Sequence, residues 1–342
     1  MRRFVFALLL LLAVYLALSR FTEVQQIAAT LRRGNGWWLA LALLLQAAWI
    51  VNIALTLRAI YRLLGLETHL AHLLPLAVSN TFVNIAAPSG GMGGMALFIS
   101  DGRRRGLSPA RVTIAGVLYV LSEYFSVLCA VAVGLWVLLR QNNLTAVEVG
   151  AAGFLLVVML ALAGLLVLGA SSPPAFERVL LGAARTINAW LHPFVRRPYL
   201  SEVRAHEFAA EACEGLAALH TNWRAYLPPA ALALVGKALL IGLLWALFLA
   251  FDQPVTAATL IAGFSIGHLF TLVSPTPSGL GVVEGAMTVA LGTQGVPLSA
   301  ATVITLAFRG YTFWLPFLYG FFGLRILHHQ WDREAAKEEA PA

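Results

Sequence analysis

Four ionisable residues lie near the middle of long apolar runs: Glu123, Lys237, Glu284 and Arg309. A charge in hydrocarbon is costly, so each side chain is expected to face the interior of a helix bundle and to find a partner. Two acids and two bases predict two ion pairs, with Glu284–Arg309 preferred and Glu123–Lys237 as the remainder. Either the pairs only hold helices in register, or Lys237 or Arg309 meets an anionic group in a central cavity.

Two further apolar runs are interrupted, by APSGGMGG at 87–94 and by SPTPSGLG at 274–281. Proline and clustered glycine do not continue a helix cheaply, so each run predicts two half-helices joined by a turn. Polar and glycine residues at the breaks are candidate ligand-binding residues: Asn84, Ser89, Gly90, Gly91, Ser274, Thr276, Ser278, Gly279 and Gly281.

Helices that restart after these glycines, near Met92 and Val282, would offer free backbone N–H groups to an anion such as phosphate. The alternative is that the glycines only allow tight helix packing. Asn80 and His268 lie close to the breaks in sequence. His268 alone is expected to be a hydrogen-bonded packing residue rather than a proton carrier.

Sequence motifs of soluble enzymes do not stand out. There is no Walker sequence, no zinc-type His/Glu spacing and no Gly-x-Ser-x-Gly, and GGMGG at 90–94 does not follow a strand. Cys129 lies in an apolar run and Cys213 in a polar loop, which predicts neither a disulfide nor a metal site. No cofactor and no metal are expected.

Composition predicts a membrane protein. The 342 residues are 60% hydrophobic and 11% charged, whereas soluble domains carry about 25% charged residues. The mean hydropathy is +0.81. The net charge of +7 comes mostly from arginine, which indicates cytoplasmic loops rather than nucleic-acid binding.

A spanning helix needs about 20 apolar residues. Six long candidates and the two interrupted runs, 73–100 and 255–291, give about eight apolar regions. Arg2 and Arg3 precede the first candidate, and we favour an uncleaved span there over a signal peptide because no small-residue cleavage pattern follows. The six candidate spans are 4–19, 37–57, 112–139, 147–170, 226–251 and 299–327.

Loop charges predict the orientation. Arg58, Arg62 and the segment 101–106 place the first broken run as a hairpin that enters and leaves on the cytoplasmic side. The second broken run starts and ends outside, and both termini are then cytoplasmic in a multi-pass protein of the cell membrane. Arg32 and Arg33 fall in an outside loop and disagree with this statistical rule.

The broken regions resemble each other. PSGGMGGMA at 88–96 matches PSGLGVVEGA at 277–286, and GLSPARVT at 106–113 resembles GVPLSAATVI at 295–304. Each unit reads span–hairpin–span, over about 37–140 and 226–327, and the loop charges give the units opposite orientations. The predicted fold class is therefore all-α: a polytopic integral membrane protein with two re-entrant broken-helix hairpins and an inverted-repeat architecture. Chance similarity of two Gly/Pro turns is the alternative.

Residues 1–327 are predicted to form a single transmembrane domain. Within it, FERVLLGAARTINAWL at 176–191 and EVRAHEFAAEACEGLAAL at 202–219 have apolar residues at helical spacing. We expect helices at the cytoplasmic membrane interface over 171–225, with a solvated linker as the alternative. Residues 328–342 are expected to be a polar cytoplasmic tail.

The runs 84–119 and 274–320 resemble the flippase-like family named for the membrane region of lysylphosphatidylglycerol synthase. The second run is the more specific, because it contains Pro-x-Pro-x-Gly-x-Gly-x-x-Glu-Gly followed by an arginine in the last span. The resemblance covers about 8–327. It implies that the chain moves lipids between leaflets, and it matches motif positions to Gly279, Gly281, Glu284, Gly285 and Arg309.

Two departures from the family pattern matter. Many members carry Glu-Arg-x-x-Asp after the first hairpin, where this chain reads YVLSE at 119–123, so that only the final acid survives, as Glu123. Lysyl-transferring members also add a soluble C-terminal acyltransferase domain. This sequence reaches Ala342 soon after its last span, so no aminoacyl-tRNA-dependent transferase activity is expected in it.

The expected function is a lipid translocase for an anionic, aminoacylated or isoprenoid-linked lipid, driven by a gradient or passive because no ATP site is present. One alternative is the membrane subunit of a lipid-modifying transferase without its own catalytic domain; another is a non-transporting scaffold. Membrane lipids are the expected partners. A separate lipid-modifying enzyme and a second copy of the chain remain open as partners, and nucleic acid is not expected.

Overall fold

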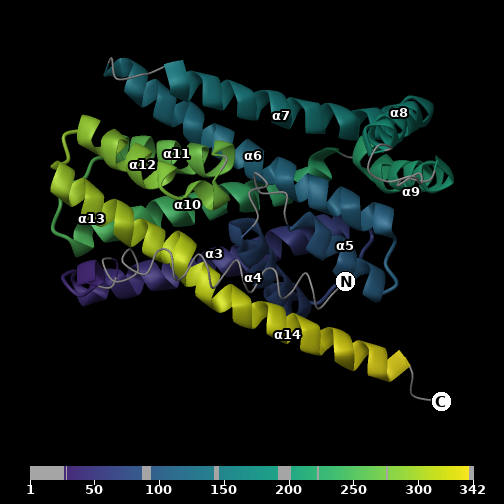
Figure 1. The fold of residues 1–342 in the computed structure, drawn as a ribbon, viewed down its shortest axis with the longest axis horizontal. Coiled ribbons are helices and arrows are strands. Elements are labelled where there is room, and N and C mark those ends of the chain that lie inside the picture. The colour runs from purple at the N-terminus through teal and green to yellow at the C-terminus, as the bar shows by residue number, and fades with distance from the viewer. Residues whose placement is uncertain are drawn as a thin grey trace.

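Helices form where the sequence carries its long apolar runs. The computed structural model describes residues 27, 29–86, 94–141, 146–191, 202–221, 223–274 and 276–338. Every regular element in those residues is helical, which confirms the all-α class (Figure 1). The predicted span 4–19 and the candidate site residues Ser89, Gly90 and Gly91 lie outside the described residues.

Among the described residues, four helices are long and apolar enough to cross a membrane: α3 (Gly36–Leu63), α6 (Pro109–Arg140), α7 (Ala146–Ser171) and α10 (Leu227–Ala250). They coincide with four of the six predicted spans. Local sequence fixes where two of them begin. The side chain of Asn35 accepts a hydrogen bond from the backbone N of Trp37 before α3, and Ser108 accepts one from Arg111 before α6.

Both interrupted runs form pairs of shorter helices. The first pair is α4 (Leu70–Ala86) and α5 (Met95–Arg104). The second pair is α11 (Ala257–Val273) and α12 (Val282–Thr293), with a short 3₁₀ turn, η2 (Pro277–Gly279), between them. The backbone turns through positive φ at Ser278 (46°), Gly279 (72°) and Gly281 (83°). Glycine reaches this region without a Cβ penalty, so the motif glycines make the break feasible.

The last predicted span, 299–327, is not one regular helix. It consists of α13 (Leu298–Arg309), a π-helical turn η3 (Gly310–Trp314) and α14 (Leu315–Glu338). Pro316 has no N–H to donate to the carbonyl of residue 312, which an α-helix would require there, so the ladder rearranges. α14 continues past residue 327, and the segment predicted as a polar tail therefore starts as helix.

Three helix pairs make up the centre of the bundle. α3 packs along α10 in the antiparallel sense, and the N–H of Asn35 donates to the carbonyl of Ala250 at 2.8 Å. α4 packs against α14, and α11 packs against α6. Small residues allow close approach in both of these pairs: Gly320 and Gly323 face α4, and Gly134 faces α11.

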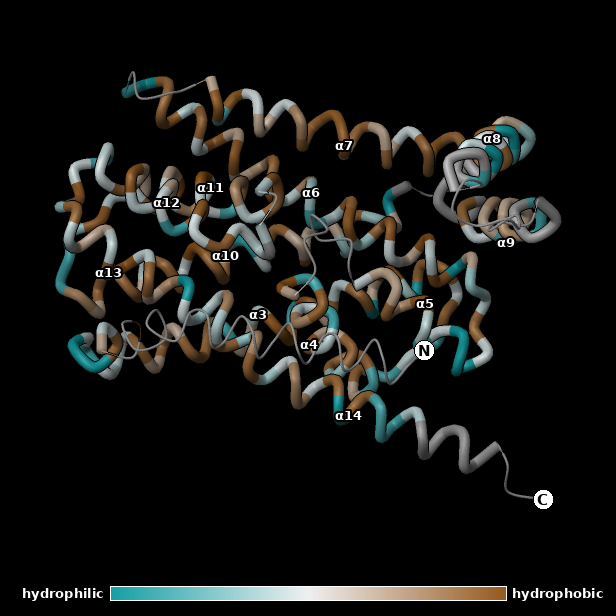
Figure 2. The backbone as a smooth tube through the Cα atoms, in the orientation of Figure 1, coloured by the Kyte–Doolittle hydropathy of each residue, from teal (hydrophilic) through white to brown (hydrophobic). Residues whose placement is uncertain are grey.

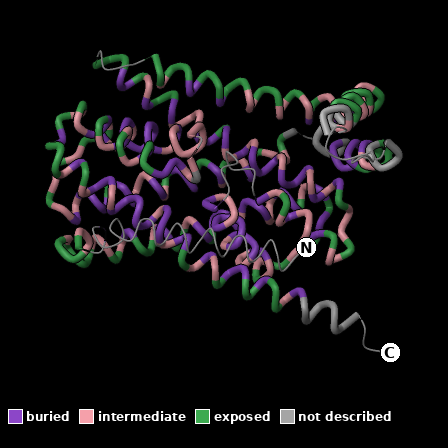
Figure 3. Tube along the Cα trace, in the orientation of Figure 1, coloured by how far each residue is buried: buried purple, intermediate pink, exposed green. Residues whose placement is uncertain are grey.

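α7 lies at the edge of the bundle and is apolar yet mostly exposed. Figure 2 shows it as largely hydrophobic, and Figure 3 shows little of it buried. Phe154, Val157, Leu160 and Val167 are among its exposed side chains. Lipid is the solvent that suits such a face. α8 (Pro173–Leu191) and α9 (Glu202–Thr221) follow it, which confirms helices in the loop but leaves their interfacial placement a prediction.

Loops predicted to share a membrane side lie together. The side-chain amide N–H of Gln294, after α12, donates to the side-chain oxygen of Gln141, after α6. At the other end, Thr68 and His69, before α4, line a cleft with Arg105, which follows α5. The α4–α5 pair thus begins and ends at one end of the bundle, and α12 ends at the other.

Candidate functional site

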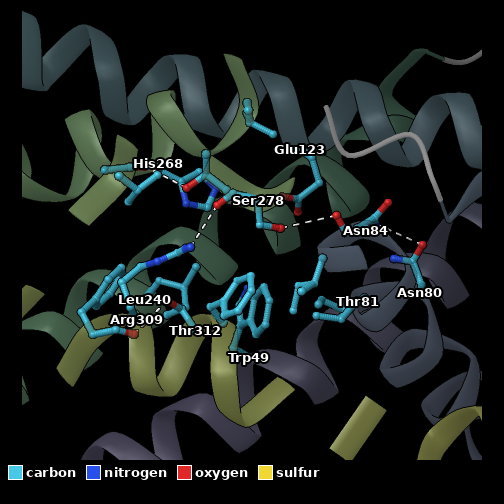
Figure 4. A pocket seen from close by; sticks show the side chains of 18 of the residues that line it. Trp49, Asn80, Thr81, Asn84, Glu123, Leu240, His268, Ser278, Arg309 and Thr312 are labelled. Carbon is cyan, nitrogen blue, oxygen red and sulfur yellow. Dashed lines mark hydrogen bonds between the residues drawn. The ribbon is translucent and has the colours of Figure 1, made fainter. Parts of the chain in front are cut away.

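A cavity of about 160 Å³ lies between α3, α4, α6, α10, α11 and α13 (Figure 4). Trp49, Glu123 and Leu240 line it from near the middle of α3, α6 and α10. Because these helices are long enough to span a bilayer, the cavity lies at the depth of the hydrocarbon. Asn84 of the first broken run and Ser278 of the second both face it.

The predicted ion pair between Glu123 and Lys237 is present. The Lys237 ammonium donates to Glu123 Oε2 at 2.6 Å, and its Nζ lies 3.3 Å from His268 Nε2. An ammonium has no acceptor, so Nε2 of His268 accepts and the ring proton of the neutral imidazole lies on Nδ1. The His268 ring also stacks on Phe264, with centroids 5.2 Å apart. His268 therefore packs as predicted, yet it also lines the cavity.

The predicted ion pair between Glu284 and Arg309 is present as well. The Nε of Arg309 donates to Glu284 Oε1 at 2.7 Å, and its Nη2 donates to the carbonyl of Ser278 at 3.1 Å. The guanidinium also lies 4.7 Å from the ring centroid of Phe313. Arg309 thereby connects α13 to the turn of the second break. Arg309 lines the cavity, whereas Glu284 lies behind it.

One backbone N–H group at each half-helix start already has a side-chain partner. Oε2 of Glu284 accepts from the N–H of Gly281 at 2.7 Å, at the start of α12. Oδ1 of Asn84 accepts from the N–H of Gly94 at 2.9 Å, at the start of α5. An anion that used these two N–H groups would have to displace the chain's own side chains, and the anion site at these termini stays a prediction. A glutamate three residues after a cap position is a known capping signal, and it could have predicted this contact.

A hydrogen bond joins the two breaks. The hydroxyl of Ser278 donates to the carbonyl of Asn84 at 3.4 Å, and Asn84 donates to Oδ1 of Asn80 at 3.3 Å, as Figure 4 shows. Ser274 and Thr276 serve the turn itself: their hydroxyls lie 2.9 Å apart, and Thr276 donates to the carbonyl of Leu280. The breaks therefore meet across the cavity.

The predicted site residues fall into three groups. Glu123, Asn84, Ser278 and Arg309 line the cavity. Lys237 and Glu284 do not line the cavity but form ion pairs with two residues that do, Glu123 and Arg309. The remaining described candidates shape the turn rather than the cavity: Ser274, Thr276, Gly279 and Gly281.

Comparison with known protein families shows to which family this chain belongs. The sequence model of the lysylphosphatidylglycerol synthase transmembrane region matches residues 4–320. This chain belongs to that family. It is also similar to the UPF0104 membrane protein MJ1595 of Methanocaldococcus jannaschii, with 30% identity over 94 residues. That alignment spans 28% of this chain and 28% of the relative. The chain is therefore a multi-pass membrane protein.

Several cavity residues of this family member were not expected from sequence. Thr81 lies with Asn80 and Asn84 on the cavity side of α4, and this polar i, i+1, i+4 spacing in an apolar helix was an available signal. Trp49, Tyr124 and Thr312 also line the cavity. Their sequence surroundings resemble any other apolar run, so only the packing of distant helices reveals them.

Proposed function

We propose that this protein moves a lipid with an anionic headgroup between leaflets, and that the headgroup passes through the cavity. The observation that carries this proposal is a cavity at hydrocarbon depth that receives polar side chains from both broken helices and has two ion pairs beside it, each with a buried base. Moving a charged headgroup through hydrocarbon is prohibitively costly. A cavity with fixed charges and hydrogen-bonding groups lowers that cost, while the acyl chains stay in lipid.

The ion pairs suggest how a headgroup would be bound. Lys237 and Arg309 are each 4% exposed, whereas their partners Glu123 and Glu284 are 26% and 20% exposed. The carboxylates are therefore the more accessible members. A lipid phosphate would replace a carboxylate as the partner of Lys237 or Arg309, exchanging one anion for another so that no base is left unpaired.

The cavity has to widen during this cycle. Its volume of about 160 Å³ is below the roughly 300–1,000 Å³ of typical ligand pockets. The contact between Ser278 and Asn84 closes it between the breaks. Separating the two breaks would enlarge the cavity, and the polar side chains released there would meet the headgroup.

An inverted repeat supports opening toward alternate sides. We propose that α3, α4–α5 and α6 correspond to α10, α11–α12 and α13–α14. In that correspondence the packing of α4 on α14 matches that of α11 on α6, and α3 packs on its own counterpart α10. The α4–α5 pair begins and ends at the end of the bundle that carries Arg58 and Arg62, which we take as cytoplasmic in a cell membrane.

The test is a leaflet-exchange assay in vesicles that contain the purified chain and fluorescent phosphatidylglycerol. We expect Glu123→Gln and Arg309→Gln each to slow exchange about tenfold or more, as expected when a charged hydrogen-bond partner is lost. Glu214→Gln is the matched control, because this exposed carboxylate pairs with Arg111 away from the cavity.

Folding of each variant is checked by gel filtration and by its thermal midpoint in detergent. Exchange at the wild-type rate in folded Glu123→Gln and Arg309→Gln would contradict the proposal. If the wild-type chain binds the lipid without exchanging it, the membrane subunit of a lipid-modifying enzyme becomes the better interpretation.

A further inference from the structure

A second cleft, of about 550 Å³, opens at the end of α3. Arg58 and Arg62 of α3 and Arg105 after α5 contribute to it, together with the connecting segment 65–69. It shares no lining residue with the central cavity. Three arginines from two separate parts of the chain thus line one space.

The cleft carries an excess of positive charge without partners. Its one lining carboxylate, Glu67, forms no ion pair with Arg58, Arg62 or Arg105, and no other described carboxylate lies within 4.0 Å of their guanidinium nitrogens. The acid on the adjoining helix, Asp101, is engaged by His72 and Trp331 instead. The cleft therefore lacks an anion among the described residues.

One donor in the cleft is buried and unused. The Nε of Arg58 has no hydrogen-bond partner among the described residues, and Arg105 makes a single side-chain bond, to Thr68 at 3.3 Å. A buried donor without an acceptor is unfavourable by about 1–3 kcal/mol, more for charged groups. An external acceptor that binds several guanidinium groups at once would remove this cost, and phosphate oxygens fit that geometry.

The simpler explanation is that these arginines only neutralise the negative end of α3. The last carbonyls of α3 already have backbone partners, however: Leu64 donates to Ile60, Gly65 to Arg62, and Leu66 to Tyr61 at 2.8 Å. The guanidinium groups are not needed to cap the helix. They remain available to a ligand.

We propose that Arg58, Arg62 and Arg105 together bind the phosphate of an anionic phospholipid at this end of the bundle. The cleft lies where the apolar length of α3 ends, which is the depth of lipid headgroups. A free phosphate has the same chemistry, and the experiment distinguishes the two sources. The site goes beyond the proposed transport and does not depend on the central cavity.

The test titrates the purified full-length chain in an uncharged detergent with phosphatidylglycerol, with phosphatidylcholine and with inorganic phosphate. Binding is followed by microscale thermophoresis. We expect tight binding of phosphatidylglycerol only, with the Arg58→Gln/Arg62→Gln variant at least about tenfold weaker, because charge-assisted bonds to phosphate are lost. Arg58→Lys/Arg62→Lys should bind with intermediate affinity, since an ammonium attracts phosphate as a point charge.

Arg32→Gln/Arg33→Gln is the matched control, because it removes two charges before the opposite end of the same helix. It should bind phosphatidylglycerol like the wild type. Arg62 is exposed, so Arg62→Gln alone keeps the test valid if the double variant does not fold. Unchanged binding in the arginine variants, or equal binding of phosphatidylcholine, overturns the site. Binding of inorganic phosphate as tight as that of the lipid overturns the assignment to a lipid.

Discussion

Buried ion pairs often cost as much in lost hydration as they return in attraction. Lys237 and Arg309 are almost fully buried, and each also contacts a second polar group, His268 Nε2 or the carbonyl of Ser278. Such pairs are weak evidence for stability on their own. Variants that remove one or both charges can separate a role in helix register from a role in ligand exchange.

Removing one member of the Glu123–Lys237 pair should destabilise the protein more than removing both. Lys237→Met leaves Glu123 beside a buried apolar side chain. We expect the free energy of unfolding to fall by about 3 kcal/mol, which is the lower end of the range for a broken buried ion pair, because Glu123 is partly exposed. Glu123→Gln/Lys237→Met should recover most of that loss. The thermal midpoint in detergent measures both. If the double variant also exchanges lipid like the wild type, the pair is only structural.

Gly279 in the second break should be difficult to replace. Its φ is +72°, and an added Cβ would lie 2.4 Å from Val283 Cγ2 and 3.1 Å from the carbonyl of Phe270. We expect Gly279→Ala to lower stability by about 1–3 kcal/mol through backbone strain and overpacking. Gly285→Ala is the control, because a Cβ added at this position of α12 would meet no atom within 4 Å. Equal thermal midpoints for the two variants would contradict this account.

At the scale of single residues, sequence predicted the pairing but not every partner. Glu123, Lys237, Glu284 and Arg309 stood out because a charge in an apolar run has few alternatives to another such charge. The second contact of Glu284, with the N–H of Gly281, was not predicted, although its capping spacing of three residues is visible in the sequence.

Among the elements, α14 departs most from its prediction. Trp331, past the predicted end of the span, contacts the bundle: its indole N–H donates to Asp101 at 2.8 Å, and His72 lies 2.9 Å from the same carboxylate. Arg104 stacks over Trp331 at 4.2 Å. Hydropathy ends the span at residue 327 and cannot anticipate this contact, because its members come from α4, α5 and α14 and are brought together only by the packed bundle.

Trp331 should anchor α14. Trp331→Phe removes the donor to the fully buried carboxylate of Asp101, and a hydrogen bond to a charged group contributes about 1.5–3 kcal/mol. We expect faster hydrogen exchange in the second half of α14, measured by mass spectrometry, and a lower thermal midpoint. Trp136→Phe is the control, because Trp136 is more than half exposed on α6. Unchanged exchange in α14 would mean that this contact does not hold the helix.

On the scale of the whole molecule, the helices of each broken run, α4–α5 and α11–α12, include one that packs on a helix from the other half of the chain. α6 of the first unit packs on α11 of the second, and α14 of the second packs on α4 of the first. The repeated Pro-Ser-Gly segments predict two units from sequence, whereas the packing of α6 on α11 and of α14 on α4 is a property of the assembled bundle. If transport widens the cavity, contacts between the units must break while contacts within a unit persist.

A cross-link between the units should therefore stop transport. Gln141, after α6, and Gln294, after α12, contact each other at one end of the bundle. In a Cys129→Ser/Cys213→Ser background, Gln141→Cys/Gln294→Cys joined by a short bis-methanethiosulfonate reagent should lose lipid exchange and regain it on reduction. Arg111→Cys/Glu214→Cys, which joins α6 to α9, should exchange lipid with or without the reagent, because α9 belongs to neither broken pair. Exchange that persists in the first cross-linked variant would mean that the headgroup crosses without relative motion of the two units at this end.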